Sequence, residues 1–454
     1  MLMMYKRWIA TMGATILLVP LLAACGSSSS NSDAKPADNA DSNKTEPKTA
    51  AADSFGSDEK AEILIRVGIS DEQFEQKYRN VLKQKFPNVT FTKAPTTIKL
   101  QDQLAATPPD LFDQGYTNLQ ELTNLDLALN LDPLVKKYGV DLNRFDPYII
   151  KDVRSYSVNK NELLLIPFSV QPFVLHYNKD LFDKFGVAYP KANSTWQDLI
   201  ELSKKLARNE GGVAYRGLDA GLNVNRMQKQ LSLPFVDAKT WKSLVGSTPG
   251  WKTLYQTYAD IYGVPGNFPE GAKHGDGRKA FLETKTLAMY PHIVMVTDTD
   301  FVQAAQGGFK LGITTYPVFK DKPGVGTGLF GGGLAVNKLS KQQDLAFKVA
   351  VYYSSDEVQK ALSKMGYVTP LVSPDVRKTL FEGNPLAAGL DLNAIYGTRA
   401  ADPYERTDWD QKAFDIVNAG MQNFFTGKTD INSTMREVDE KIEKMVADQK
   451  AQTK

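Results

Sequence analysis

The chain is poor in the residues on which most catalytic and metal sites depend. Its 454 residues include one cysteine, Cys25, and three histidines, His176, His274 and His292. A single cysteine excludes a disulfide within the chain, so the fold must be held by its apolar core. The histidines form no HExxH motif and no cluster, which leaves a zinc site or a catalytic triad without support. We therefore expect no metal, no cofactor and no enzymatic activity.

An excess of charge of either sign is also missing. Lys and Arg number 54 against 52 Asp and Glu, a formal net charge of +2. This balance provides no broad basic surface, so we expect no nucleic-acid partner. Carboxylates are numerous, but their spacing selects no pair of the kind that glycoside hydrolysis requires.

One glycine run formally matches a dinucleotide-binding fingerprint. Residues 326–331 read GTGLFG. In that fingerprint the glycines open directly into a helix, whereas here residues 332–336, GGLAV, predict an extended segment. We interpret the run as a bend where the backbone crosses between parts of the fold or approaches a ligand closely.

The N-terminal residues resemble a bacterial export signal. A basic pair at residues 6–7 precedes an apolar stretch over residues 9–24, which is too short and too interrupted to span a bilayer comfortably. The tetrapeptide at 22–25, Leu-Ala-Ala-Cys, matches the lipobox of secreted bacterial lipoproteins. The resemblance implies a signal peptide over residues 1–24 and a lipid on Cys25. We therefore expect the protein on the extracytoplasmic face of the cell membrane, anchored by that lipid.

Residues 25–60 are polar and contain one large apolar residue, Phe55. Such a composition buries too little surface to offset the entropy lost on ordering. We expect the lipidated cysteine to be followed by a flexible tether that extends to residue 60.

Beyond residue 60 the sequence pattern alternates between strands and helices. The β-branched run at 63–67 predicts a strand, a capping box that begins at Ser70 predicts a helix, and residues 89–91 predict a second strand. Capping patterns at Thr195 and Ser354 predict further helices. The sequence therefore predicts a mixed α/β fold in more than one domain.

Residues 166–199 contain the most specific pattern, IPFSVQPFVLHYNKDLFDKFGVAYPKANSTWQDL. This segment resembles the signature of family 1 extracellular solute-binding proteins, the maltose-binding-protein-like receptors of carbohydrate ABC importers. The segments 109–112, 281–289, 309–319 and the stretch that begins at Gly331 resemble further segments of that family, in the same order. Each match is weak alone, and the order makes the resemblance specific.

The resemblance implies a two-lobe periplasmic-binding-protein-like fold of type II, with discontinuous lobes. Lobe 1 is expected to comprise residues 61–170 and 331–374, and lobe 2 residues 171–330 and 375–454. Hinge motion about the crossing segments would trap a ligand in the cleft between the lobes. The implied partners are a small carbohydrate and ABC permease subunits, and we expect a monomer.

On the family pattern, the crossings fall near Gln171, near Phe330 and just past Pro370. Neutral hydrogen-bonding groups beside flat aromatic faces suit a sugar. The maltose receptor has charged side chains where this chain has Thr117, Asn118 and Gln171, so maltose itself is not favoured. The ligand-binding positions implied by the matching motifs are Gln114, Tyr116, Thr117, Asn118, Gln171, Phe173, Tyr290, His292, Phe330 and Trp409, with Phe414 as the alternative to Trp409.

Two alternatives remain open. The same fold could bind a peptide, an amino acid or an anion, for which basic groups would have to converge, and Arg226 is the candidate cation. The chain could also be a surface-tethered protein that acts on or adheres to polysaccharide. The lack of a nucleophile or metal signature disfavours the enzymatic form of this second alternative.

Overall fold

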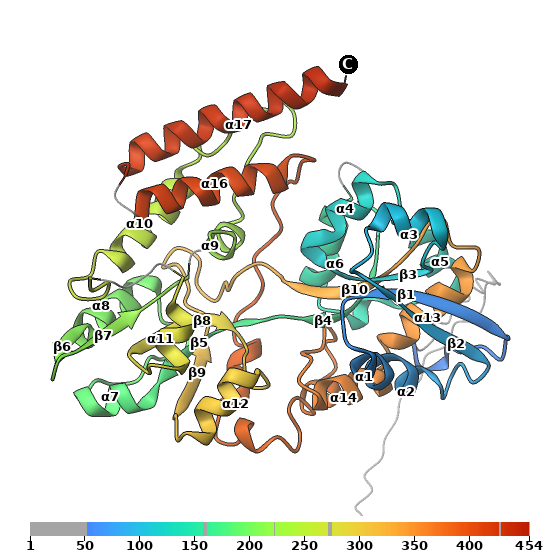
Figure 1. Ribbon diagram of the computed structural model, residues 1–454, viewed down its shortest axis with the longest axis horizontal. Helices are drawn as coiled ribbons and strands as arrows, with labels where there is room; N and C mark the ends of the chain where they lie inside the picture. Colours follow the sequence, from blue (N-terminus) through green and yellow to red (C-terminus); the bar gives the residue numbers. More distant parts are fainter. Residues whose placement is uncertain (1–51, 158–160, 222, 271–274, 426–427, 454) are drawn as a thin grey trace, which may run out of the picture. The chain divides into compact units, whose positions relative to one another are not determined.

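The computed structural model describes residues 52–157, 161–221, 223–270, 275–425 and 428–453 (Figure 1). The predictions for the signal peptide, for lipidation of Cys25, for the tether up to residue 51 and for His274 lie outside these residues. Among the described residues, no helix combines the length and the apolar character that a membrane crossing requires.

The strands of the described residues form two five-stranded sheets (Figure 1). The first sheet has the order β2-β1-β3-β10-β4, in which β1 is parallel to β2 and β3, and β10 is antiparallel to β3 and β4. A late segment of the chain therefore lies between two early strands. The strands are β1 (Ala61–Val67), β2 (Val89–Pro95), β3 (Leu111–Gly115), β4 (Ile166–Val170) and β10 (Gly331–Val336).

The second sheet has the order β6-β7-β8-β5-β9. Strand β5 is antiparallel to both of its neighbours, and all six of its residues are buried, including the polar His176 and Asn178. The strands are β5 (Phe173–Asn178), β6 (Arg208–Glu210), β7 (Val213–Leu218), β8 (Leu287–Ile293) and β9 (Leu311–Thr315). Helices and two mixed sheets confirm the predicted α/β class.

The helices fall into two groups. Those of the first group come from residues 71–155 and 343–377, and those of the second group from residues 179–306 and 410–453. The first group comprises α1 (Asp71–Phe74), α2 (Asn80–Leu82), α3 (Leu100–Ala106), α4 (Leu119–Asn124), α5 (Asp132–Tyr138), α6 (Pro147–Ser155), α13 (Gln343–Tyr353), α14 (Asp356–Lys364) and α15 (Pro374–Arg377). The second group comprises α7 (Lys179–Phe185), α8 (Trp196–Leu206), α9 (Asn225–Gln230), α10 (Pro249–Tyr262), α11 (Gly277–Leu282), α12 (Thr299–Gln306), α16 (Asp410–Phe425) and α17 (Ile431–Thr453). A π-helical turn, Glu75–Arg79, joins α1 to α2.

The chain passes from the first sheet to the second through Gln171 and Pro172, directly between β4 and β5. The Gln171 backbone N–H donates to the Phe330 carbonyl at 2.8 Å, and the Val170 N–H donates to the Val368 carbonyl at 2.9 Å. Three segments that are distant in sequence are therefore hydrogen-bonded side by side where the chain changes sheet.

The glycines at the start of β10 are required by steric contacts with β4. A Cβ at Gly331 would lie 2.3 Å from the Ser169 carbonyl oxygen, and one at Gly333 would lie 2.6 Å from the Ile166 carbonyl oxygen. The backbones of β4 and β10 approach too closely for side chains at these two positions. The run is thus a close backbone approach at the crossing and not the entry to a helix.

The folded part of the chain begins earlier than the composition indicated. Residues 52–60 were predicted to belong to the tether, but Ala52–Ser54 form a 3-10 turn. Phe55 is buried in the first core, which is the apolar cluster between the first sheet and the first group of helices; the second core is the corresponding cluster of the second sheet and the second group. The Phe55 ring lies edge-on to Tyr138, with 6.0 Å between the ring centres. The tether prediction is therefore wrong for these residues, because a single large apolar side chain is enough to fix the segment on an existing core.

Candidate functional site

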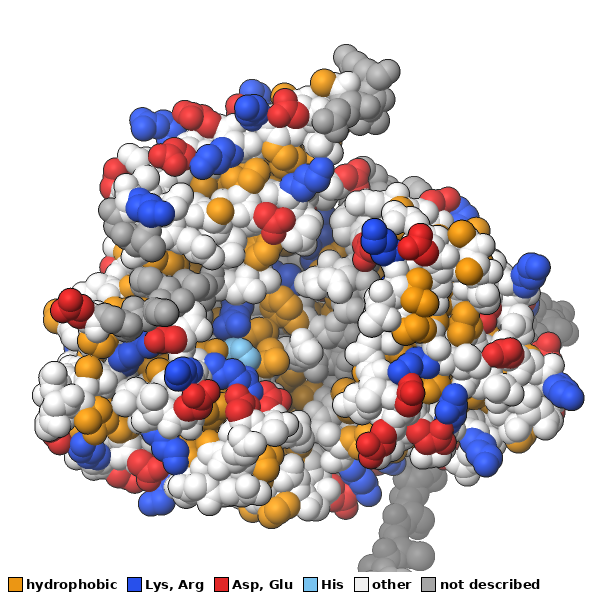
Figure 2. Space-filling model, viewed as in Figure 1, with side chains coloured by type: hydrophobic (Ala, Val, Ile, Leu, Met, Phe, Trp, Pro, Cys, Tyr) orange, Lys and Arg blue, Asp and Glu red, His pale blue; other side chains and the backbone are white. Residues whose placement is uncertain are grey.

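A cavity of about 350 Å³ is lined by residues that follow strands of the first sheet and by residues of the second group of helices. Thr117 and Asn118 follow β3, three polar residues come from α9, and Phe414 comes from α16. Figure 2 shows a hollow in the face drawn there, with hydrophobic, basic and histidine side chains inside it. The lining residues are Thr117, Asn118, Gln120, Tyr156, Asn223, Asn225, Gln228, Lys229, Phe235, Phe330, Tyr404, Arg406, Asp410, Gln411 and Phe414.

A second cavity of about 390 Å³ adjoins the first, because Asn223 and Phe414 line both. Its lining contains an aromatic ring, a cation and several glycines. The residues are Gly221, Asn223, Arg226, Gly275, Gly277, Tyr290, Phe414 and Asn418. Together the two cavities offer room for a ligand of more than one ring.

Several buried polar atoms in these linings lack a hydrogen-bond partner among the described residues. They are the Oη atom of Tyr156, the Oδ1 atoms of Asn225 and Asn418, and the Oδ2 atom of Asp410. Burial raises the pKa of Tyr156, so its phenol keeps the proton and is a donor, whereas the two amide oxygens are acceptors. Buried polar groups are nearly always satisfied in native proteins. These four atoms therefore lie in the cavity walls as buried polar groups that the described residues leave without a partner.

Arg406 is a buried cation in the lining of the first cavity. Its guanidinium forms a buried ion pair with Asp152 at 3.1 Å and lies 3.8 Å from the centre of the Tyr156 ring. Asp410 lies in the same lining, and burial raises its pKa while Arg406 opposes this effect. Most of the hydrogen-bonding capacity of Arg406 is used within the protein, by Asp152, Ser155 and the Tyr404 hydroxyl.

Lys229 is a second buried cation in the first cavity. Burial lowers the pKa of its ammonium group to about 8. The Nζ atom donates to the Leu329 carbonyl at 2.7 Å and lies 4.3 Å from the centre of the Phe330 ring. Lys229 thus joins helix α9 to the segment that enters β10, and its ammonium retains hydrogens that this single bond does not use.

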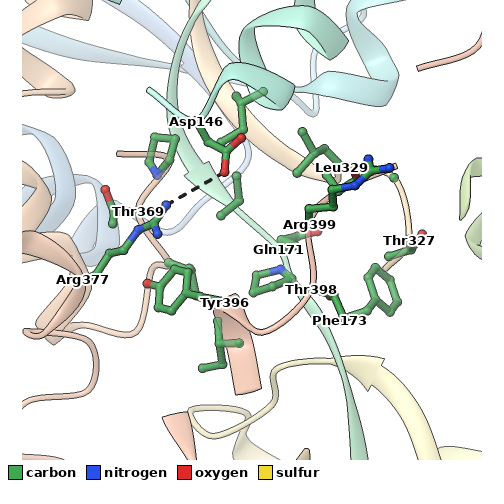
Figure 3. A pocket seen from close by; sticks show the side chains of 18 residues that line it. Asp146, Gln171, Phe173, Thr327, Leu329, Thr369, Arg377, Tyr396, Thr398 and Arg399 are labelled. Carbon is green, nitrogen blue, oxygen red and sulfur yellow. Dashed lines mark hydrogen bonds and ion pairs between the residues drawn. The ribbon is translucent and has the colours of Figure 1, made fainter. Parts of the chain in front are cut away.

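A third cavity, of about 240 Å³, lies where the three crossing segments meet (Figure 3). Gln171, Phe173, Thr327 and Thr369 line it, and the ion pair of Arg377 with Asp146, at 4.0 Å, closes one side. The cavity is formed largely by the backbone segments that connect the sheets.

Comparisons with known proteins agree with this architecture. A sequence profile for bacterial extracellular solute-binding proteins matches residues 71–360. The chain belongs to this family. Its members bind solutes and are not enzymes, so family membership confirms the expectation of no enzymatic activity.

Solved structures with the same fold include several sugar-binding proteins. A sugar transporter of Rhizobium etli in an open conformation has a TM-score of 0.68 at 20% identity, over 84% of this chain and 98% of that one. An ABC substrate-binding protein of Listeria monocytogenes, in complex with cycloalternan, has a TM-score of 0.66 at 18% identity, over 86% and 100%. The sugar-binding protein MalE of Xanthomonas citri has a TM-score of 0.66 at 18% identity, over 86% and 98%. The two-lobe periplasmic-binding-protein fold is thereby confirmed.

A curated relative matches over a shorter segment. It is the sn-glycerol-3-phosphate-binding periplasmic protein of Agrobacterium fabrum, 25% identical over 162 residues. The match covers 33% of this solute-binding protein and 35% of the relative's own length.

The structure brings some of the predicted site residues together in this solute-binding protein. Thr117, Asn118 and Phe330 line the first cavity, and Tyr290 lines the second. The His292 ring stacks on Tyr290, with 4.9 Å between the ring centres, next to that second cavity. Burial, followed by the charge of Arg226, lowers the pKa of His292 to about 4, so this imidazole is neutral at pH 7.

Other predicted residues lie elsewhere. Gln171 and Phe173 line the third cavity, and Phe173 also contacts Phe330, with 5.2 Å between the ring centres. Tyr116 is fully buried, and its hydroxyl donates to the Ser169 carbonyl at 2.9 Å. The side chain of Gln114 donates to the Asn118 carbonyl at 3.1 Å. Tyr116 and Gln114 are absent from the linings of all three cavities.

Trp409 packs edge-on against Trp241, with 5.1 Å between the ring centres, and it too lines none of the three cavities. Phe414, which the sequence offered as the alternative aromatic residue, lines both ligand-sized cavities. Sequence reasoning named Arg226 of α9 as a candidate cation but missed Asn225, Gln228 and Lys229 of the same helix. It also missed Tyr404 and Arg406. The available signal was the run 223–230, in which Val224 and Met227 are buried between polar residues that face the cavities.

Proposed function

We propose that this solute-binding protein captures a sugar or an oligosaccharide in the two adjoining cavities and delivers it to the permease of an ABC importer. The observation that supports this proposal is the combination of aromatic faces with unpartnered neutral polar atoms. Phe330 and Phe414 offer apolar faces, and the same linings contain the neutral side chains of Asn225 and Asn418, whose buried Oδ1 atoms have no partner among the described residues. A sugar ring needs both kinds of surface.

The related structures support the same ligand class. The Listeria protein was solved with cycloalternan, and another structure of the same fold contains mannobiose. We further propose that lobe 1 comprises residues 61–170 and 331–374, that lobe 2 comprises residues 171–330 and 375–454, and that hinge motion about the crossings closes the cleft. A lipid on Cys25 would hold the receptor at the extracytoplasmic face of the membrane, near its permease.

Thermal unfolding with a panel of saccharides tests the proposal. A ligand that binds only the native state stabilises it by about 2.7 kcal/mol at a hundred times its Kd. We expect at least one saccharide to raise the Tm. Phe414→Ala is expected to weaken binding of that saccharide at least about tenfold, a typical loss for a buried anchoring aromatic residue. Trp409→Ala, a matched aromatic control outside the cavities, is expected to change the affinity less than about threefold.

The outcomes separate the open readings of the site. If no saccharide raises the Tm while an amino acid or a peptide does, the sugar assignment is wrong. If Trp409→Ala weakens binding as much as Phe414→Ala, the ligand lies outside the two cavities. The polysaccharide-acting enzyme is not proposed, because the family is not enzymatic.

A further inference from the structure

Arg226 is a cation whose charge the protein does not neutralise by an ion pair among the described residues. It lies on α9 and lines the second cavity. Its guanidinium lies 5.0 Å from the centre of the Phe173 ring, and Nη1 makes one long hydrogen bond, 3.4 Å, to the Pro291 carbonyl. Most of the five guanidinium N–H donors therefore remain available to a ligand.

Two other arginines in the same part of the fold, Arg216 and Arg278, have carboxylate partners. Arg216 forms ion pairs with Asp219 and Asp276, and Arg278 forms ion pairs with Asp298 and Asp300. Both are structural cations whose charge is balanced by carboxylates. Arg226 takes part in none of the ion pairs formed among the described residues, although it belongs to the same part of the fold.

The surroundings of Arg226 leave its guanidinium accessible from the cavity. A Cβ added at Gly221 would lie 3.0 Å from Nη1, so the guanidinium rests directly on bare backbone. No carboxylate occurs in the described lining of this second cavity. In the first cavity Asp410 is the only lining carboxylate among the described residues, and it lies beside Arg406. Arg226 and Lys229 thus give the joined cavities an excess of positive charge.

We propose that the ligand is an anionic saccharide, whose carboxylate or phosphate pairs with Arg226 in the second cavity while its neutral ring contacts Phe414 and extends into the first cavity. This inference rests on the proposed function. It adds that the site selects an acidic sugar derivative over the neutral sugar of the same shape. An anionic group held by a guanidinium makes charge-assisted hydrogen bonds, often two in parallel. Asn418 lines the same cavity, and its buried Oδ1 atom has no partner among the described residues.

Calorimetric titration of the purified protein tests the inference with matched pairs of ligands. The neutral members are galactotriose, xylotriose and maltose. Their acidic counterparts are trigalacturonate, glucuronosyl-xylobiose and maltose 1-phosphate, and inorganic phosphate and glycerol 3-phosphate are added as anions without a ring. We expect one acidic saccharide to bind at least about thirtyfold more tightly than its neutral counterpart. The carboxylate and phosphate pairs distinguish the two sources of negative charge.

Arg226→Gln and Arg208→Gln form a matched pair of variants. Arg208 also lacks a carboxylate partner among the described ion pairs, and its guanidinium lies 4.3 Å from the centre of the Phe185 ring, but it lines none of the three cavities. Arg226→Gln is expected to abolish the preference for the acidic ligand, so that the acidic and the neutral counterparts bind with similar affinity. Arg226→Lys is expected to restore part of the preference, and Arg208→Gln to leave it intact.

Three results would overturn the inference. Equal or tighter binding of the neutral counterparts would overturn it and leave the sugar-binding function standing. An acidic preference that survives in Arg226→Gln would show that another group holds the charge. Binding of phosphate or glycerol 3-phosphate without any saccharide would overturn both the inference and the proposed function. The comparison of neutral and acidic ligands on the unaltered protein decides the question even if Arg226→Gln does not fold.

Discussion

The ammonium group of Lys229 is held away from water without an ion-pair partner among the described residues. Its pKa falls from 10.5 to about 8 because burial disfavours the charged form, with Asp152 acting in the opposite direction and Arg406 in the same one. At neutral pH the charge persists and costs stability. The ammonium group donates a hydrogen bond to the Leu329 carbonyl, in the segment just before β10.

This cost predicts a dependence of stability on pH. Between pH 8 and 10.5 the unfolded chain holds the Lys229 proton while the folded protein has released it, so the free energy of unfolding rises with pH in this window. A pKa difference of one is worth about 1.4 kcal/mol, which makes the full rise about 3 kcal/mol. We expect urea titrations to show unaltered protein gaining stability relative to Lys229→Met as pH rises from 8 to 10.5. A constant difference would contradict the lowered pKa.

At the residue scale, the sequence predicted the cavity positions that belong to ordered motifs. Thr117 and Asn118 follow a recognisable strand, and Phe330 lies within the glycine-rich run. Their positions in the fold could therefore be predicted from the order of the motifs along the chain. Lys229 was not predictable, because a lysine on a short polar helix resembles a solvated one. Arg406 was missed for a different reason: its partner Asp152 is 254 residues away, and a single sequence holds no record of that contact.

At the scale of elements, the N-terminal caps of helices are the features that the sequence predicted best. The capping box expected at Ser70 and the N-cap expected at Thr195 are both present, and Thr195 also forms a capping box, with Asp198. The helix expected to begin at Ser354 starts one residue later, because Ser355 caps it while the Ser354 hydroxyl donates to the Val351 carbonyl. Two adjacent serines offer equivalent caps, and only the packing of the preceding helix decides between them.

The capping box at the start of helix α8 can be tested by substitution. The Thr195 hydroxyl accepts from the Asp198 N–H at 3.1 Å, and the Asp198 carboxylate accepts from the Thr195 N–H at 2.8 Å. Thr195→Ala is expected to lower the free energy of unfolding by about 1 kcal/mol, because the first turn loses an acceptor. Thr195→Ser keeps the hydroxyl and is expected to retain most of that stability in the same urea titration. An equal loss in both variants would assign the effect to the threonine methyl group.

At the scale of the whole molecule, the buried pair of Arg406 and Asp152 joins the two main cores. Asp152 lies on α6, whose Ile149 and Val153 belong to the first core, and Arg406 follows Tyr404 of the second core. Both side chains are about 5% exposed. Both ions are largely removed from water, so the charge of each is balanced mainly by the other.

Breaking this pair is expected to be expensive. Asp152→Asn leaves the Arg406 charge buried without its partner and is expected to lower the free energy of unfolding by about 3–5 kcal/mol. Asp402→Asn removes the exposed pair with Lys151 in the same region and is expected to cost less than about 1 kcal/mol. The losses in the free energy of unfolding are measured by chemical denaturation of the two variants. Equal losses would show that burial does not strengthen the pair, and a double change of Asp152→Asn with Arg406→Met is expected to recover part of the loss.

The position of β10 has a consequence for how the protein is made. Strands β3 and β4 are complete by residue 170, yet both wait for residues 331–336 to pair with their facing edges. A chain synthesised from its N-terminus therefore carries unpaired strand edges through more than a hundred residues of further synthesis. Such edges invite non-native pairing, and contacts this distant in sequence form slowly. All five strands of the second sheet are therefore produced before the first sheet can close, and β10 sets the earliest moment at which that first sheet can form.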